Sequence, residues 1–145
     1  DLPKLEQLVV TKSWWDTVDI LDRVVGSLVY DKPELEKIIL QWSLSDNIWL
    51  RRIAIDHQLL RKEKTNVQLM EKILLHNLNQ TEFFINKAIG WALRDYSKTN
   101  PTWVAGFIEK NKERMAELSI KEASKYLQHH WKAQSLLEKS RPFML

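Results

Sequence analysis

The sequence of 145 residues contains no cysteine, three glycines and four prolines. Without cysteine there is no disulfide, no thiolate metal site and no cysteine nucleophile, and such a chain fits the reducing cytoplasm. So few turn-forming residues leave little material for an all-β fold. No apolar run approaches the roughly 18 residues that a transmembrane helix needs. These absences favour a helical, cytoplasmic protein.

What the sequence does contain is the composition of a folded domain, with 44% hydrophobic and 28% charged residues. The length suits one unit, so we expect a single domain over residues 1–145. Because the chain starts Asp1-Leu2-Pro3, without methionine or leader pattern, it has the appearance of an internal start. The net charge of +3 permits an anionic partner without demanding one.

Capping residues and apolar periodicity predict about eight helices separated by short polar loops. Ser13, Asn47, Thr81 and Asn100 are the predicted N-caps, and Ser119 with Glu122 predicts a capping box. The predicted helices cover residues 5–10, a stretch of roughly 15 residues from 14, 33–43, 48–62, 67–79, 82–98, a segment from 101, and one from 119. No segment shows the alternation of a strand, so the fold class is predicted to be all-α.

Three of the longer helices begin near Ser13, Asn47 and Thr81, which lie 34 residues apart from 13 to 47 and from 47 to 81. A period of this length is typical of stacked helical hairpins. In such a solenoid the second helices of the hairpins line up along a concave surface. An irregular helical bundle is the alternative that periodicity alone leaves open.

Trp15, Asp19 and Asp22 form a stripe on the first long helix, because they are spaced i, i+4 and i+7. This stripe lies one position round from the apolar one, which is an uncommon place for a tryptophan beside a carboxylate. From this helix alone, a core-flanking Trp15 and a solvated Asp19 are the simpler interpretation.

A second stripe, on the predicted helix 82–98, contains Lys87, Trp91, Arg94 and Lys98 at i, i+4, i+7 and i+11. Cations separated by helical turns, with a flat ring among them, suit a phosphate backbone and a sugar or base face. A solvated basic face with Trp91 at the core boundary is an equally good interpretation from this helix alone.

Other chemistries find little support in the sequence. The adjacent Arg51 and Arg52 point about 100° apart, so at most one is expected to face a groove squarely. Four histidines lack metal-ligand spacing, and we expect them at surface or boundary positions. A Gly-rich phosphate loop and a G-x-S-x-G motif are both missing, which disfavours nucleotide hydrolysis and serine-hydrolase chemistry.

Five segments together resemble the AlkD-like DNA alkylation repair family of DNA glycosylases. They are residues 13–19 (SWWDTVD), 49–55 (WLRRIAI), 82–94 (EFFINKAIGWALR), 96–98 (YSK) and 100–104 (NPTWV). The resemblance covers nearly the whole chain and weakens after about Leu127. Because family members are longer at the front, the chain resembles their C-terminal part without several N-terminal helices.

The resemblance implies a curved stack of HEAT-like repeats whose basic concave face holds duplex DNA. It also implies excision of positively charged N3- and N7-alkylated purines without drawing the base into a pocket. By residue, it assigns the groove tryptophans to Trp15 and Trp91, the catalytic aspartate to Asp19 and the DNA-contacting arginine to Arg52. The stripe adds Lys87, Arg94 and Lys98 as DNA-binding candidates.

The implied chemistry is coherent, because an N3- or N7-alkylated purine is already cationic and departs as a neutral base. The sugar develops positive charge instead, and the carboxylate of Asp19 would stabilise it. We therefore expect a monomer that acts on alkylated duplex DNA without a metal or organic cofactor. The alternatives are a non-catalytic HEAT-like module for damaged or branched DNA and a protein-binding helical scaffold.

Overall fold

The computed structural model describes residues 2–11 and 15–127 of the chain. Within these ranges there are eight α-helices, three short 3-10 helices and no strand. In chain order the elements are α1 (Leu2–Thr11), α2 (Trp15–Asp31), η1 (Pro33–Leu35), α3 (Glu36–Trp42), α4 (Ile48–Asp56), η2 (Lys62–Lys64), α5 (Val67–His76), α6 (Phe83–Ser97), α7 (Pro101–Asn111), η3 (Lys112–Arg114) and α8 (Glu117–Ala123). The predicted all-α fold class is therefore confirmed.

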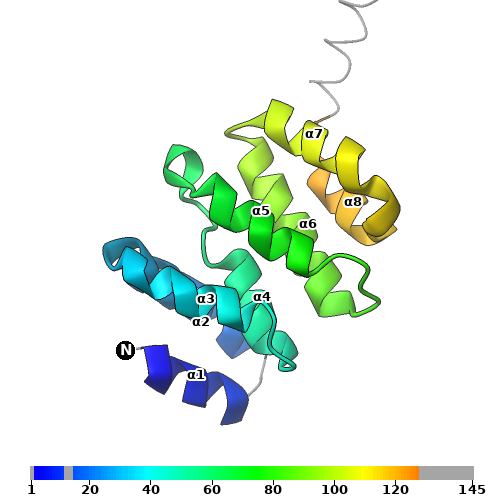
Figure 1. The fold of residues 1–145 in the computed structure, drawn as a ribbon. Helices are drawn as coiled ribbons and strands as arrows, with labels where there is room; N and C mark the ends of the chain where they lie inside the picture. The colour runs from blue at the N-terminus through cyan, green and yellow to red at the C-terminus, as the bar shows by residue number, and fades with distance from the viewer. Residues whose placement is uncertain (1, 12–14, 128–145) are drawn as a thin grey trace, which may run out of the picture.

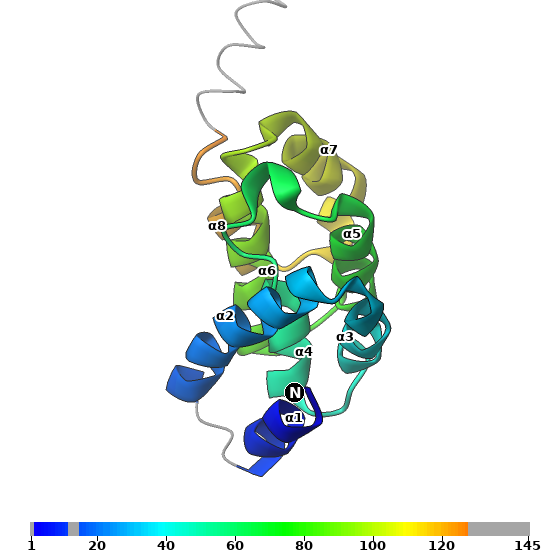
Figure 2. The ribbon, with the colours of Figure 1, turned by 90° about the vertical axis from the view of Figure 1, so that its left-hand side faces the viewer.

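The helices pair along the chain and the pairs stack into a HEAT-like solenoid (Figure 1). The second helices contact one another in sequence, α2 with α4, α4 with α6, and α6 with α8. Seen from the side, α2, α6 and α8 lie in one layer and α3, α5 and α7 in the other (Figure 2). The 34-residue spacing predicted this arrangement, because α2, α4 and α6 begin at residues 15, 48 and 83.

The helix from residue 48 is shorter than predicted. We expected it to extend to Lys62, but α4 ends at Asp56 and the chain turns before η2. Leu60 and Lys62 have positive φ angles of 69° and 55°, which an α-helix does not accommodate. Apolar and basic residues with good helix propensity occupy this segment, so local signals do not reveal the break.

Two predicted caps need correction, whereas two others are confirmed. Ser119 lies inside α8, and its Oγ donates a hydrogen bond to the backbone carbonyl of Asn86 at 2.7 Å, so it starts no capping box. Thr81 is replaced as N-cap of α6 by Glu82. The side chains of Asn47 and Asn100 do accept hydrogen bonds from the first turns of α4 and α7. Ser13 lies outside the described residues.

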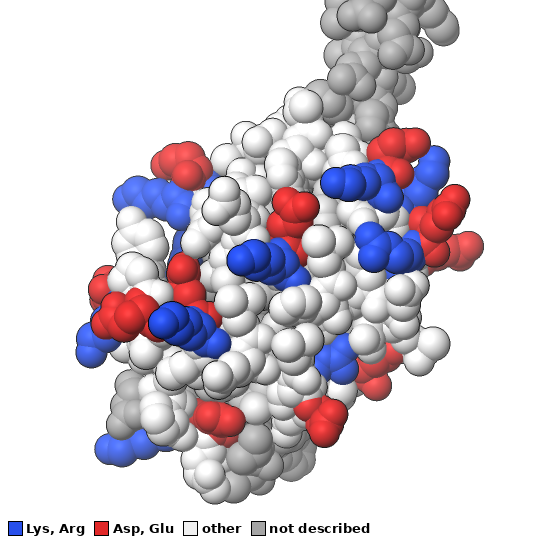
Figure 3. All heavy atoms as spheres, viewed as in Figure 1, with Lys and Arg blue, Asp and Glu red and all other residues white. Residues whose placement is uncertain are grey.

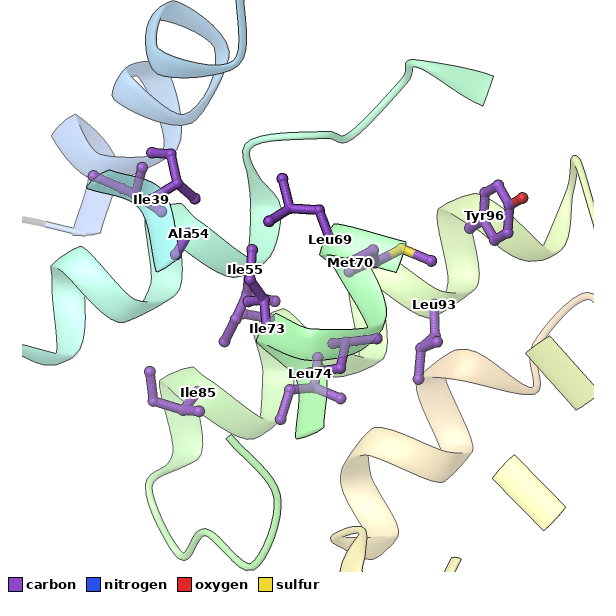
Figure 4. Packing of buried hydrophobic residues seen from close by; sticks show 14 of the residues in the cluster. Ile39, Ala54, Ile55, Leu69, Met70, Ile73, Leu74, Ile85, Leu93 and Tyr96 are labelled. Carbon is purple, nitrogen blue, oxygen red and sulfur yellow. The ribbon is translucent and has the colours of Figure 1, made fainter. Parts of the chain in front are cut away.

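A continuous apolar core runs between the two layers (Figure 4). Ile53 of α4, Ile73 and Leu74 of α5, and Ile85 and Leu93 of α6 are each at most 1% exposed. Fully burying one such side chain contributes about 1.5–3 kcal/mol relative to leaving it in water. The core therefore fixes α4 and α6, the two central helices of the stack, relative to each other.

The face formed by α3, α5 and α7 carries positive and negative side chains intermixed, without a patch of one sign (Figure 3). None of the helices in the described part of the chain is long and apolar enough to span a lipid bilayer.

Candidate nucleic-acid interface

A groove of about 940 Å³ opens where α2, the end of α4, the segment 59–64 and α6 meet. The groove therefore brings together three parts of the chain that are far apart in sequence: α2, the segment between α4 and α5, and α6. The charged residues along it are Asp22, Arg23, Asp56, Arg61, Lys62, Glu63, Lys64, Arg94, Asp95 and Lys98. Among the described lining residues, six cations therefore share one surface with four carboxylates, so this part of the groove carries a surplus of positive charge.

Trp91, Arg94 and Lys98 of the predicted basic stripe all line this groove. Lys87 does not line the groove. Its Nζ lies 5.5 Å from the centre of the Trp91 ring, which does. The same ammonium is 5.4 Å from the centre of the Phe83 ring. The ammonium of Lys87 thus lies close to two aromatic rings of α6, one helical turn away on either side.

Arg94 is held in place from the side of α8. Its Nη1 lies 3.3 Å from Oε2 of Glu122, and its Nη2 donates to the hydroxyl of Tyr126 at 3.3 Å. The hydrogen bond to Tyr126, together with Glu122, raises the pKa of Arg94. The same bond lowers the pKa of the Tyr126 phenol, and Lys98 adds to this effect from 4.9 Å above the ring. Arg94 is therefore a permanently charged, preoriented donor at the groove.

The first predicted stripe is seen in part. Trp15 and Asp19 belong to α2, but their side chains lie outside the described residues. Asp22, the third member of the stripe, is 5% exposed and lines the groove. That Trp15 is a groove tryptophan and Asp19 the catalytic aspartate stays a prediction.

Arg52 does not line the groove. Its side chain is 4% exposed, its Nε lies 4.0 Å from Oδ2 of Asp56, and its guanidinium lies 5.9 Å from the centre of the Phe84 ring. Arg51 is half-buried and donates from Nε to Oδ1 of Asn77 at 2.8 Å. Neither arginine lines the groove directly, although Arg52 contacts a carboxylate that does.

The segment 57–64 contributes a wall that the sequence did not predict. Arg61 donates from Nη2 to the carbonyl of Gly26 at 2.6 Å and lies 5.3 Å from the centre of the Tyr30 ring. Lys62 and Lys64 are exposed beside it. The sequence predicts the end of a helix over these residues, so it does not indicate which surface their positive charges share. A cluster of cations between two helices was the one signal that pointed to them.

His57 corrects the expectation that the histidines lie at surface or boundary positions. It is 3% exposed at the groove lining, and its Nδ1 lies 2.7 Å from the carbonyl oxygen of Ala54. Burial lowers the pKa of His57 to about 4, so the ring is neutral at pH 7. Nδ1 therefore carries the proton and donates it to Ala54. His129 and His130 lie outside the described residues.

Comparison with known proteins assigns the sequence and the fold to a family. A sequence profile for "DNA alkylation repair enzyme" matches residues 1–127. The chain belongs to the DNA alkylation repair enzyme family. A solved structure described as a predicted DNA alkylation repair enzyme from Enterococcus faecalis is similar, with 40% sequence identity and a TM-score of 0.78. The match covers 86% of this chain and 58% of that protein. No curated protein matched the chain.

Membership of the DNA alkylation repair enzyme family confirms the resemblance that the sequence motifs carried. The present chain spans 58% of the length of its Enterococcus neighbour. Within that span it provides the second helices α2, α4 and α6 and the basic groove that they border.

Proposed function

We propose that the protein is a DNA glycosylase that hydrolyses the N-glycosidic bond of cationic N3- or N7-alkylated purines in duplex DNA. In this proposal it works in the cytoplasm, as a monomer and without drawing the base out of the helix. One observation carries the proposal: a groove in a DNA alkylation repair family member combines Trp91, Arg94 and Lys98 with buried carboxylate at Asp22.

The cations of the groove suit the DNA backbone. Arg94 and Lys98 are separated by about one turn of α6 and border the same surface as Lys62 and Lys64. Phosphates on a duplex would be neutralised from both walls, since contacts to phosphate position the protein without reading sequence. Lys87 extends the row of cations along α6 toward its N-terminus.

The carboxylates of α2 suit the reaction. As the bond between the purine nitrogen and C1′ breaks, the bonding electrons leave with the alkylated base, which becomes neutral. Positive charge grows on the deoxyribose, and a carboxylate in a groove partly shielded from water stabilises that charge. The oxygen of a water molecule then bonds to C1′ and the water releases a proton.

Asp19 is the proposed carboxylate for this step, because the family motif places the catalytic aspartate there. It precedes Asp22 by three residues on α2, a spacing that puts two positions on neighbouring parts of one helix face. The electron-rich rings of Trp91 and Trp15 are proposed to hold the sugar and favour the same positive charge.

For Arg52 the proposed DNA contact requires a movement. The guanidinium is buried next to Asp56, so reaching a phosphate means leaving this position. If it stays, it acts on the groove through Asp56, by holding a carboxylate at the lining.

The test is release of 7-methylguanine from methylated duplex DNA by the wild-type protein and by the Asp19→Asn variant, with Glu109→Gln as control. Glu109 is an exposed carboxylate of α7 that does not line the groove. We expect release by the wild type and the control and loss of about two orders of magnitude or more in Asp19→Asn. Salt-sensitive duplex binding without any release would instead identify a non-catalytic DNA-binding module.

A further inference from the structure

Leu60 occupies an unusual position at the rim of the groove. It lines the groove, yet it is 62% exposed, which makes it one of the most exposed large apolar side chains in the described residues. Its neighbours along the chain are the cations Arg61, Lys62 and Lys64. Leu60 is therefore an exposed apolar side chain on a loop whose charged residues are three cations and Glu63, next to the half-buried Leu59, which also lines the groove.

The backbone at Leu60 is held in a conformation that leucine disfavours. Its φ of 69° lies in the left-handed region, where glycine and asparagine are the common residues and leucine is rare. Either of those residues would make the same turn after α4 without strain. The turn alone therefore does not account for a leucine here, and residues in such strained positions concentrate at ligand-binding sites.

The loop is fixed from both sides of the groove. The backbone N–H of Leu60 donates to Oδ2 of Asp95 on α6 at 2.9 Å. On the other side, Arg61 donates to the carbonyl of Gly26 on α2. Asp95 follows Arg94 directly in sequence, so the leucine is tied to the helix that carries the predicted DNA-contacting residues. The position of the leucine is thus determined by the walls of the groove.

Duplex DNA is the partner that these features fit. The described lining residues include six cations against four carboxylates, a positive surplus that suits phosphates, and Trp91 lies on α6 across from the loop. Proteins that bind the minor groove of DNA often insert apolar side chains such as leucine among basic residues. An exposed leucine surrounded by cations has the same combination.

We propose that Leu60 is an apolar wedge that enters a groove of the duplex held in this cleft and packs against deoxyribose and base edges. The inference rests on the proposed function insofar as it takes duplex DNA as the ligand. It adds a second contact surface, opposite α6, in which cations fix the phosphates and the leucine fixes the depth of the duplex.

The experiment measures the affinity of the protein for a methylated duplex by fluorescence anisotropy over a series of salt concentrations. The variants are Leu60→Gly, Leu60→Ala and Lys62→Gln. Leu44→Ala is the matched control, because Leu44 is 65% exposed and does not line the groove. Thermal unfolding of each variant checks the fold, and glycine at position 60 suits the positive φ.

An apolar contact and a phosphate contact differ in their salt dependence. We expect Leu60→Gly and Leu60→Ala to weaken binding by roughly tenfold at every salt concentration, with an unchanged slope of log affinity against log salt. Lys62→Gln should reduce that slope by about 0.9. Leu44→Ala should bind like the wild type.

The inference would be overturned by wild-type affinity in both Leu60 variants, by a Leu60 effect that appears as a change in salt slope, or by a wild type that binds no duplex. Release of 7-methylguanine distinguishes it from the proposed function. Binding that depends on Leu60 without base release would leave the wedge standing and reject the glycosylase. If Leu60→Gly releases 7-methylguanine at the wild-type rate and binds the duplex with wild-type affinity, the glycosylase stands and the wedge is rejected.

Discussion

Gly26 of α2 lies directly against the backbone carbonyl of His57 at the end of α4. A Cβ atom at position 26 would overlap the carbonyl oxygen of His57, so a side chain larger than hydrogen has no room there. The contact is also where Arg61 donates to the carbonyl of Gly26. One glycine therefore allows α2 to approach α4 closely enough to border the groove.

Replacing Gly26 by alanine should move α2 away from α4, because the neighbouring atoms are backbone and have little freedom to shift. We expect a loss of about 1–3 kcal/mol in the free energy of unfolding, measured by urea denaturation. Gly106→Ala on α7 is the control, since a Cβ there meets no described atom within 4 Å apart from its chain neighbours and the backbone of its own helix. That variant should be more stable by about 0.5–1 kcal/mol. Equal stability of the two variants would contradict the close-approach argument.

His57 should make stability depend on pH between about 6.5 and 4. Burial lowers its folded pKa to about 4, whereas the unfolded chain has the ordinary value near 6.5. In this interval the unfolded state binds the additional proton, so the free energy of unfolding falls as pH falls. The full effect, reached near pH 4, is of order 3 kcal/mol.

The measurement is the difference in unfolding free energy between the wild type and His57→Asn at pH 7 and pH 5. Asparagine keeps a side-chain N–H for the carbonyl of Ala54 but does not titrate. The wild type should lose more stability than the variant over this range. A parallel decline in both proteins would assign the acid sensitivity to other groups.

Arg94 should contribute to the salt dependence of duplex binding. Arg94→Ala removes a charged donor from the groove, so the slope of log affinity against log salt should decrease by about 0.9. Lys110→Ala is the control, because Lys110 is an exposed residue of α7 away from the groove. The third interpretation of the sequence, a protein-binding scaffold, predicts instead that both variants behave like the wild type.

Ser119 should stabilise the junction of α6 and α8 rather than start a helix. Its buried Oγ donates to the carbonyl of Asn86, so Ser119→Ala should cost about 1 kcal/mol of unfolding free energy. Thr81→Ala should change stability by less than about 0.5 kcal/mol, because Thr81 is exposed and Glu82 is the N-cap of α6. The reverse order in thermal or urea unfolding would restore the capping roles that the sequence suggested.

The corrections at Ser119 and after Asp56 share one physical cause. Ser119 carries the signal of a cap, but a carbonyl 33 residues earlier in the chain competes for its hydroxyl. The segment after Asp56 has the composition of a helix, but Asp95 binds the backbone of Leu60 in a different conformation. Propensity and capping are local, and a tertiary hydrogen bond of similar strength is enough to override them.

Local sequence patterns were enough to predict that the helices exist, that they repeat about every 34 residues, and that α6 carries a basic stripe. These depend on spacings of three to four residues and on local caps, which are properties of neighbouring positions. The family motifs also consist of neighbouring residues, so they can be recognised without the structure.

Which of these residues share a surface depends on how the helices pack in three dimensions. This packing placed Asp22, the loop 59–64 and Trp91 around one groove, buried Arg52 beside Asp56, and fixed the left-handed Leu60 against Asp95. The groove and the bond between Leu60 and Asp95 join segments whose positions depend on the packing of the whole core. The burial of Arg52 depends on whether its contacts offset the free-energy cost of removing its charge from water. Local sequence patterns do not include these long-range contacts, which form only when α2, α4 and α6 are stacked.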